Sequence, residues 1–120
     1  LGCDPAALGD GGAGMLQALG VRLLDAEGRA LPAGAAALLQ LHRIDAHGLD
    51  PRLATVTLEA AVDPRIRLLG PEAAARVDGP RHGATPEQVE RCAAALGVFA
   101  DRIRWAFGRD VASLPGAGAS

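Results

Sequence analysis

One long amphipathic helix is the feature that most limits how this chain folds. Thr85 suits an N-cap, Pro86 suits the first helical position, and Gln88 completes a capping box with Thr85. Gly108 is placed to end the helix, because glycine adopts a left-handed conformation at little cost. Apolar side chains repeat at intervals of three and four residues, at Val89, Ala93, Leu96, Ala100, Ile103 and Phe107. The sequence therefore predicts a helix over 86–107 with one buried face.

Weaker helical signals occur elsewhere in the chain. Asp10 lies where an N-cap belongs, before a glycine-rich helix predicted over 11–19. A second helix is predicted over about 33–42, and a short one over 71–77. Residues 79–83 are predicted to form a loop. These helices are expected to cover a small sheet.

The strands of that sheet are predicted from alternating apolar residues. Residues 21–24 alternate briefly before a turn over 25–28. The strongest strand pattern covers 54–62, where Val56 and Leu58 fall on one face and threonines fall on the other. We therefore expect a mixed α/β fold in which helices flank a small sheet, with the 54–62 strand at its centre.

Length and charge exclude several classes of protein. With 120 residues, the chain is long enough for one domain, so residues 1–120 are treated as a single segment. Hydrophobic residues make up 49% and charged residues 22%, as in globular proteins. The net charge of −2 argues against a nucleic-acid partner or an anionic membrane surface. No apolar run is long enough to span a membrane.

The cysteines and the chain ends indicate the setting of the chain. Cys3 and Cys92 lack metal-ligand spacing, so buried reduced thiols in a cytoplasmic protein are favoured over a disulfide. His42 and His47 are five residues apart and do not share a helical face, so no metal site is expected. The chain starts with Leu1, not Met, and stops in a loop of small residues, so we expect a piece of a longer protein.

Two aspartates stand where catalytic carboxylates are often found. Asp10 lies at a glycine-rich helix start, where a ligand can approach the backbone closely, but the residues alone favour a plain N-cap. Asp63 lies just past a predicted strand end, a common ligand position in α/β proteins, but it also fits a turn before Pro64. The residues alone leave both alternatives open.

Several motifs, taken together and in order, resemble one family. They are Asp10-Gly11-Gly12-Ala13-Gly14, Ile44-Asp45 through Leu53, Ala61-Val62-Asp63 leading to Gly70-Pro71, and Gly79-Pro80-Arg81-His82-Gly83. Their order and spacing resemble the bacterial type I glycerate kinases. The similarity covers nearly the whole chain, but only about the middle third of a family member.

The resemblance implies an enzyme that uses ATP and Mg²⁺ to phosphorylate glycerate to phosphoglycerate, within a two-domain fold. It implies that flanking domains of the same polypeptide complete the site. On this basis Asp10 and Asp63 are the candidate catalytic residues, and the candidates for binding substrate or phosphate are Gly11, Gly12, Arg81 and His82. Arg81 and His82 have a second interpretation, as a solvated loop.

Departures from the family pattern keep other functions open. The family's Gly-Gly-Ser-Ala-Thr-Asn before Asp10 is absent, and so is the Asn-Pro that follows the position of Asp63. His82 replaces a lysine. Arg65 has no counterpart in the family pattern and is interpreted as a surface charge. One alternative is therefore a diverged, inactive relative kept as a scaffold, and a second is an unrelated small α/β binding domain.

Two further features are assigned by their composition. Trp105 and Phe107 are interpreted as core or domain-interface residues and not as a platform for a nucleotide base. Gly116-Ala117-Gly118 is a further point where a ligand could approach the backbone.

Overall fold

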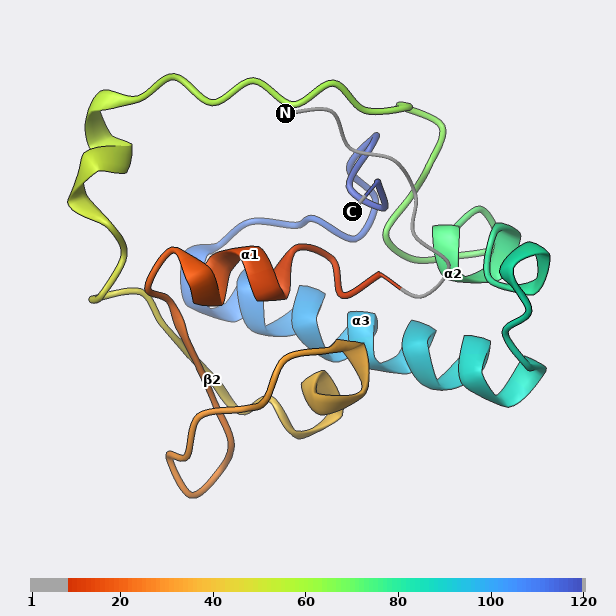
Figure 1. Cartoon of the computed structure of the whole chain (residues 1–120), viewed down its shortest axis with the longest axis horizontal. Helices are drawn as coiled ribbons and strands as arrows, with labels where there is room; N and C mark the ends of the chain where they lie inside the picture. The colour runs from red at the N-terminus through yellow and green to blue at the C-terminus, as the bar shows by residue number, and fades with distance from the viewer. Residues whose placement is uncertain (1–8, 120) are drawn as a thin grey trace.

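Helix α3 (Pro86–Phe107) is the long axis around which the other elements pack (Figure 1). The structure is a computed structural model and describes residues 9–119. The Thr85 N–H donates to Gln88 Oε1 at 2.8 Å, and the Gln88 N–H donates to Thr85 Oγ1 at 3.3 Å. Gly108 follows with a φ of 67°. The predicted bounds and both terminal signals of this helix are confirmed.

A two-stranded antiparallel sheet packs beside α3. Strands β1 (Arg22–Leu24) and β2 (Arg43–Asp45) pair so that Leu23 lies opposite Ile44. The first strand was predicted, whereas the second was not. Between them the 3₁₀ helix η1 (Ala35–Gln40) packs against α3. The fold is mixed α/β with a small sheet, as expected.

The core lies between α3 and the β1–β2 half of the chain. Phe99, Leu23 and Leu38 are buried to within 2% of full burial. The helix contributes Val89, Cys92, Ala95, Leu96, Phe99 and Ala100 to buried positions. The predicted buried face is thus right at Leu96 but wrong at Phe107, whose residue surface is 51% exposed. The core covers the middle turns of α3 but not its last turn.

The predicted strand over 54–62 is wrong. A 3₁₀ helix, η2 (Pro51–Thr55), occupies its first part, and no strand covers 56–60 in the described chain. Figure 1 shows the following segment as an extended arch running away from η2. Val56 and Leu58 are 53% and 59% exposed, so the alternation does not mark a half-buried strand of the observed sheet.

Three other helical predictions are correct in place but not in extent. Helix α1 spans Ala13–Ala18, and its N-cap residue is Gly12 instead of Asp10. The helix predicted over 33–42 is the shorter η1. The helix predicted over 71–77 is reduced to α2 (Ala74–Val77), and the predicted 79–83 loop contains the 3₁₀ helix η3 (Pro80–His82). Glycine-rich and proline-containing flanks limit each of these elements to one or two turns.

The prediction of a buried, reduced thiol is confirmed for Cys92. Cys92 is a buried free thiol, and its Sγ lies 3.6 Å from the carbonyl oxygen of Gly9. Burial raises the pKa of Cys92, and the charge of Asp10 acts in the same direction. Cys3 lies outside the described residues. No helix between residues 9 and 119 is both long and apolar enough to cross a bilayer.

Candidate functional site

A pocket of about 470 Å³ brings together two of the predicted site residues, Asp63 and Arg81. Its walls come from the loop after the extended arch, from α2 and from η3. Arg65, Glu72 and Asp78 supply its other charged side chains. Residues 18 positions apart in the sequence therefore face one space, because α2 turns the chain back toward the Asp63 loop.

Asp63 is held by the residue two positions later. Its Oδ1 accepts the Arg65 backbone N–H at 2.9 Å and the Arg65 Nε–H at 3.0 Å. Its Oδ2 accepts the Arg65 Nη2–H at 2.7 Å. The side-chain hydrogen bonds from Arg65, followed by the backbone hydrogen bond, lower the pKa of Asp63 to about 2. Asp63 is therefore ionised at neutral pH and is a weak proton acceptor.

The same motif occurs a second time in the chain. In Asp50-Pro51-Arg52, Asp50 Oδ1 accepts the Arg52 N–H at 2.9 Å, and Asp50 Oδ2 accepts the Arg52 Nη2–H at 2.5 Å. Asp50 caps η2 and does not line the Asp63 pocket. The Asp-Pro-Arg sequence thus produces this ion pair locally. The repeated Asp-Pro-Arg sequence is the signal for this ion pair, and Arg65 is a surface charge as predicted, with its side chain 88% exposed.

Arg81 is less tightly paired than Arg65. Its only described partner is Asp78, whose Oδ1 lies 3.4 Å from Arg81 Nη1. A guanidinium carries five N–H donors, so most of its hydrogen-bonding capacity faces the pocket and solvent. His82 follows directly in η3, but it is exposed and is not part of the pocket wall. Of the two predicted anion-binding residues in this loop, only Arg81 lines the same pocket as Asp63.

The second predicted group, Asp10 with its glycines, lies at the start of α1. Asp10 Oδ1 accepts the Gly12 N–H at 3.0 Å, and Asp10 Oδ2 accepts the Gly14 N–H at 2.8 Å. The amides of Gly12 and Gly14 are thus already hydrogen-bonded to Asp10. Gly11 has a φ of +66°, and a Cβ there would lie 3.1 Å from Leu96 Cδ2. These residues do not line the Asp63 pocket, although Gly11 lies over the core near Leu68, five residues after Asp63.

The C-terminal loop packs against the Asp63 loop. A Cβ on Gly118 would lie 2.0 Å from the carbonyl oxygen of Arg67, and one on Gly116 would lie 2.3 Å from Val62 Cγ2. The Arg67 Nη1–H donates to the carbonyl oxygen of Ser113. The space beside Gly116 and Gly118 is therefore filled by residues of this chain. The contact holds residues 62–67 in place beside the pocket.

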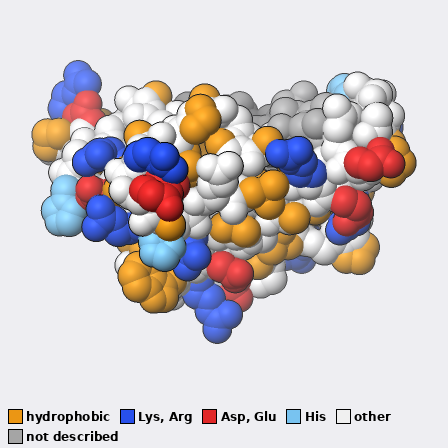
Figure 2. Space-filling view, turned by 90° about the horizontal axis from the view of Figure 1, so that it is seen from below, with side chains coloured by type: hydrophobic (Ala, Val, Ile, Leu, Met, Phe, Trp, Pro, Cys, Tyr) orange, Lys and Arg blue, Asp and Glu red, His pale blue; other side chains and the backbone are white. Residues whose placement is uncertain are grey.

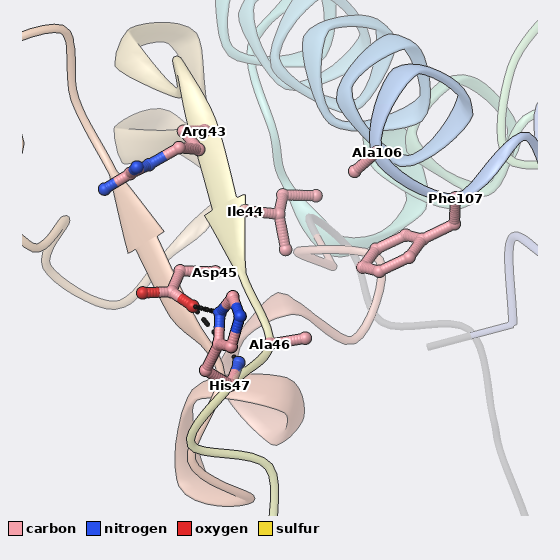
Figure 3. Close-up of a pocket in the computed structure, with 7 residues that line it drawn as sticks. All are labelled: Arg43, Ile44, Asp45, Ala46, His47, Ala106 and Phe107. Atoms are coloured by element: carbon pink, nitrogen blue, oxygen red, sulfur yellow. Dashed lines mark hydrogen bonds and ion pairs between the residues drawn. The ribbon is translucent and has the colours of Figure 1, made fainter.

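A second pocket, of about 500 Å³, contains none of the predicted site residues (Figure 3). Ile44 and Phe107 point into it from β2 and the end of α3. At one end the His47 ring lies 2.7 Å from Asp45 Oδ1. His42 is absent from its wall. Between residues 9 and 119, no three His, Cys, Asp or Glu side chains are grouped closely enough to hold a metal ion.

Comparison with known proteins assigns the family. The model of the glycerate kinase family matches residues 1–120. The chain is 44% identical to the glycerate kinase of Halalkalibacterium halodurans over all 120 of its residues. This chain belongs to the glycerate kinase family. It is also 40% identical to the glycerate 2-kinase of Escherichia coli, again over its whole length.

A solved relative shares the fold. The crystal structure of a Salmonella typhimurium LT2 protein assigned as glycerate kinase 2 matches with a TM-score of 0.88 and 46% identity. The match covers 95% of this chain and 30% of that protein. The chain likewise spans 32% of the Halalkalibacterium and Escherichia coli kinases. It therefore corresponds to about a third of a family member, and this structure contains a segment of the family's fold.

Proposed function

We propose that this chain contributes part of the substrate site of an ATP-dependent kinase that phosphorylates glycerate. The observation that carries the proposal is the pocket that Asp63 and Arg81 share in a chain of the glycerate kinase family. Glycerate offers a carboxylate for a guanidinium and hydroxyl groups for a carboxylate. The pocket provides both kinds of partner within one space.

Arg81 is assigned to an oxyanion, which is either the carboxylate of glycerate or a phosphate. Its long contact to Asp78 leaves the guanidinium available for a bidentate interaction. Asp63 is assigned to a hydroxyl group as a hydrogen-bond acceptor. A carboxylate with a pKa of about 2 orients a hydroxyl and stays charged, but it removes a proton poorly at neutral pH.

We propose secondary roles for the other predicted site residues, which are Asp10, Gly11, Gly12 and His82. Asp10 fixes the start of α1 through two amides, which gives it a structural role whether or not it meets a ligand. Gly11 and Gly12 remain proposed backbone approach points. His82 remains a proposed neighbour of the phosphate, on the exposed side of η3.

The residues present fit Mg²⁺ bound together with ATP and not as a separate metal cage. Mg²⁺ is commonly held by one or two carboxylates together with nucleotide phosphates. When bound, ATP would supply the transferred phosphoryl group, and Mg²⁺ would be carried on its phosphates. We also place the protein in the cytoplasm, because its buried free thiol at Cys92 suits a reducing compartment.

The alternative of an inactive relative kept as a scaffold is less well supported. The chain retains 36% to 44% identity to five curated glycerate kinases over its whole length. A scaffold needs only the buried residues of the fold. Here the charged pocket residues Asp63 and Arg81 also come together.

The test is ADP release with glycerate and ATP by the full-length kinase that contains this segment. Arg81→Ala is expected to lower kcat/KM at least about tenfold, the effect of losing a charge-assisted hydrogen bond. Arg91→Ala, an exposed arginine of α3 outside the pocket, is the matched control and should leave kcat/KM unchanged. Residues 1–120 alone should show no turnover. Equal kinetics for the two variants, or no glycerate-dependent ADP release by the full-length kinase, would contradict the proposal.

A further inference from the structure

We propose that Arg65 is a positioning residue, which fixes the orientation of the Asp63 carboxylate as an acceptor for a substrate hydroxyl. This inference rests on the proposed function, because it concerns the same pocket. Arg65 itself need not touch the substrate. Its role is to hold the Asp63 carboxylate in one orientation.

The contacts between the two residues show how this is achieved. The Arg65 Nε–H is shared between both oxygens of Asp63, at 3.0 Å and 3.2 Å. The Nη2–H and the backbone N–H add one further contact to each oxygen. A carboxylate held at both oxygens by a planar guanidinium cannot rotate without breaking hydrogen bonds. The orientation of Asp63 is therefore set before any ligand arrives.

The pair still leaves Asp63 able to bind a hydroxyl. A carboxylate offers about four lone-pair positions, two on each oxygen. Arg65 makes its four contacts with only three N–H groups, because the Nε–H is shared, so about one acceptor position is left, on the Oδ2 side where the shared contact is longer at 3.2 Å. The Arg65 side chain is 88% exposed, whereas that of Asp63 is 33% exposed. The guanidinium thus lies toward solvent, and the carboxylate lies against the protein.

The other residues of the pocket leave Arg65 as the partner of Asp63. Glu72 and Asp78 line the same pocket from the α2 side, but both are acidic and cannot pair with a carboxylate. Arg81 lies near Asp78 instead of Asp63. Arg65 is therefore the cation that compensates Asp63. The equivalent ion pair between Asp50 and Arg52 lies outside this pocket. It therefore provides a control that has the same local geometry but no pocket.

The experiment compares Arg65→Ala, Arg65→Lys and Arg52→Ala in the full-length kinase by ADP release. Arg65→Ala should lower kcat about fivefold, which is the upper range for an exposed ion pair, with the KM for ATP unchanged. Arg65→Lys should give an intermediate kcat, because lysine restores the charge but not the planar fork. Arg52→Ala removes the same contacts from Asp50 and should retain wild-type kcat.

Two outcomes separate failure of this inference from failure of the proposed function. If Asp63→Asn abolishes turnover but Arg65→Ala behaves as Arg52→Ala does, Asp63 belongs to the site and Arg65 does not position it. If Asp63→Asn retains wild-type turnover, the assignment of Asp63 to the substrate site is itself wrong. Equal loss of kcat in Arg65→Ala and Arg52→Ala would indicate a general effect on folding and would overturn the positioning role.

Discussion

At the scale of single residues, two aspartates with the same local geometry differ in their surroundings. Asp50 and Asp63 both precede a proline, and each is held by the arginine two positions later. Only Asp63 lines a pocket with Arg81. Three consecutive residues, Asp-Pro-Arg, are enough to form the ion pair. The pocket also requires α2 and η3 to pack beside the Asp63 loop. Local sequence therefore explains the charge of Asp63, and tertiary structure explains its candidate function.

The buried face of α3 gives a residue-scale prediction about stability. Replacing Leu96 or Phe99 by Ala should lower the free energy of unfolding by about 2–5 kcal/mol, because each substitution leaves a cavity in the core. Trp105→Ala is the control, since Trp105 is 74% exposed and should cost under about 1 kcal/mol. Urea unfolding followed by circular dichroism measures all three. A loss at Leu96 or Phe99 no larger than at Trp105 would show that this face of α3 is not core.

At the scale of elements, the predictions succeeded where the signals are local. Thr85, Pro86, Gln88 and Gly108 each act within one turn of a helix end, so the bounds of α3 could be read from the sequence. The 54–62 strand failed because alternation predicts a strand only when a neighbouring strand and a core face are present. β2 was missed because its three residues are too few to show a period.

Part of the candidate site could also be predicted from the sequence. Asp63 and Arg81 were found through the order of motifs, and the structure places them in one pocket. Asp10 was expected to act with them, but its carboxylate is bonded to the amides of Gly12 and Gly14 at another position. Glu72 carries no motif and was missed, because only the packing of α2 beside the Asp63 loop brings it to the pocket.

The turn after β1 yields a prediction about pH. Burial acts to raise the pKa of Asp25, but hydrogen bonds from the backbone and side chain of Arg29, with one from the Glu27 N–H, outweigh it and lower the pKa. Because the folded pKa lies below the unfolded one, this stabilisation is present above about pH 4 and is lost as the pH falls toward the folded pKa. Asp25→Asn should therefore destabilise the protein more at pH 6 than at pH 3.

Urea unfolding midpoints at the two pH values measure this effect. Asp101→Asn, an exposed aspartate on α3, provides the control for the general loss of a carboxylate. A difference between wild type and Asp25→Asn that is the same at pH 3 and pH 6 would show that the charge of Asp25 does not support the turn.

At the scale of the whole molecule, much apolar surface is uncovered. Figure 2 shows hydrophobic side chains exposed between neighbouring acidic and basic groups on one face. The large hydrophobic residues that are exposed are Met15, Leu39, Leu49, Val56, Leu58, Val77, Trp105, Phe107 and Leu114. Curated relatives are about three times as long, since this segment spans 31% to 32% of each. The exposed surface is consistent with a segment that packs against other parts of a kinase.

The most direct test of the proposed function compares Asp63→Asn with Asp50→Asn in the full-length kinase. The two variants remove the same charge from the same Asp-Pro-Arg motif, but only Asp63 lines the pocket with Arg81. In the coupled assay of ADP release with glycerate, Asp63→Asn should lower kcat at least about 100-fold, the scale for a well-placed electrostatic group. Asp50→Asn should stay within about threefold of wild type, as an exposed ion pair contributes little. A near-wild-type kcat for Asp63→Asn, or an equal loss in both variants, would contradict the assignment of this pocket to the substrate site.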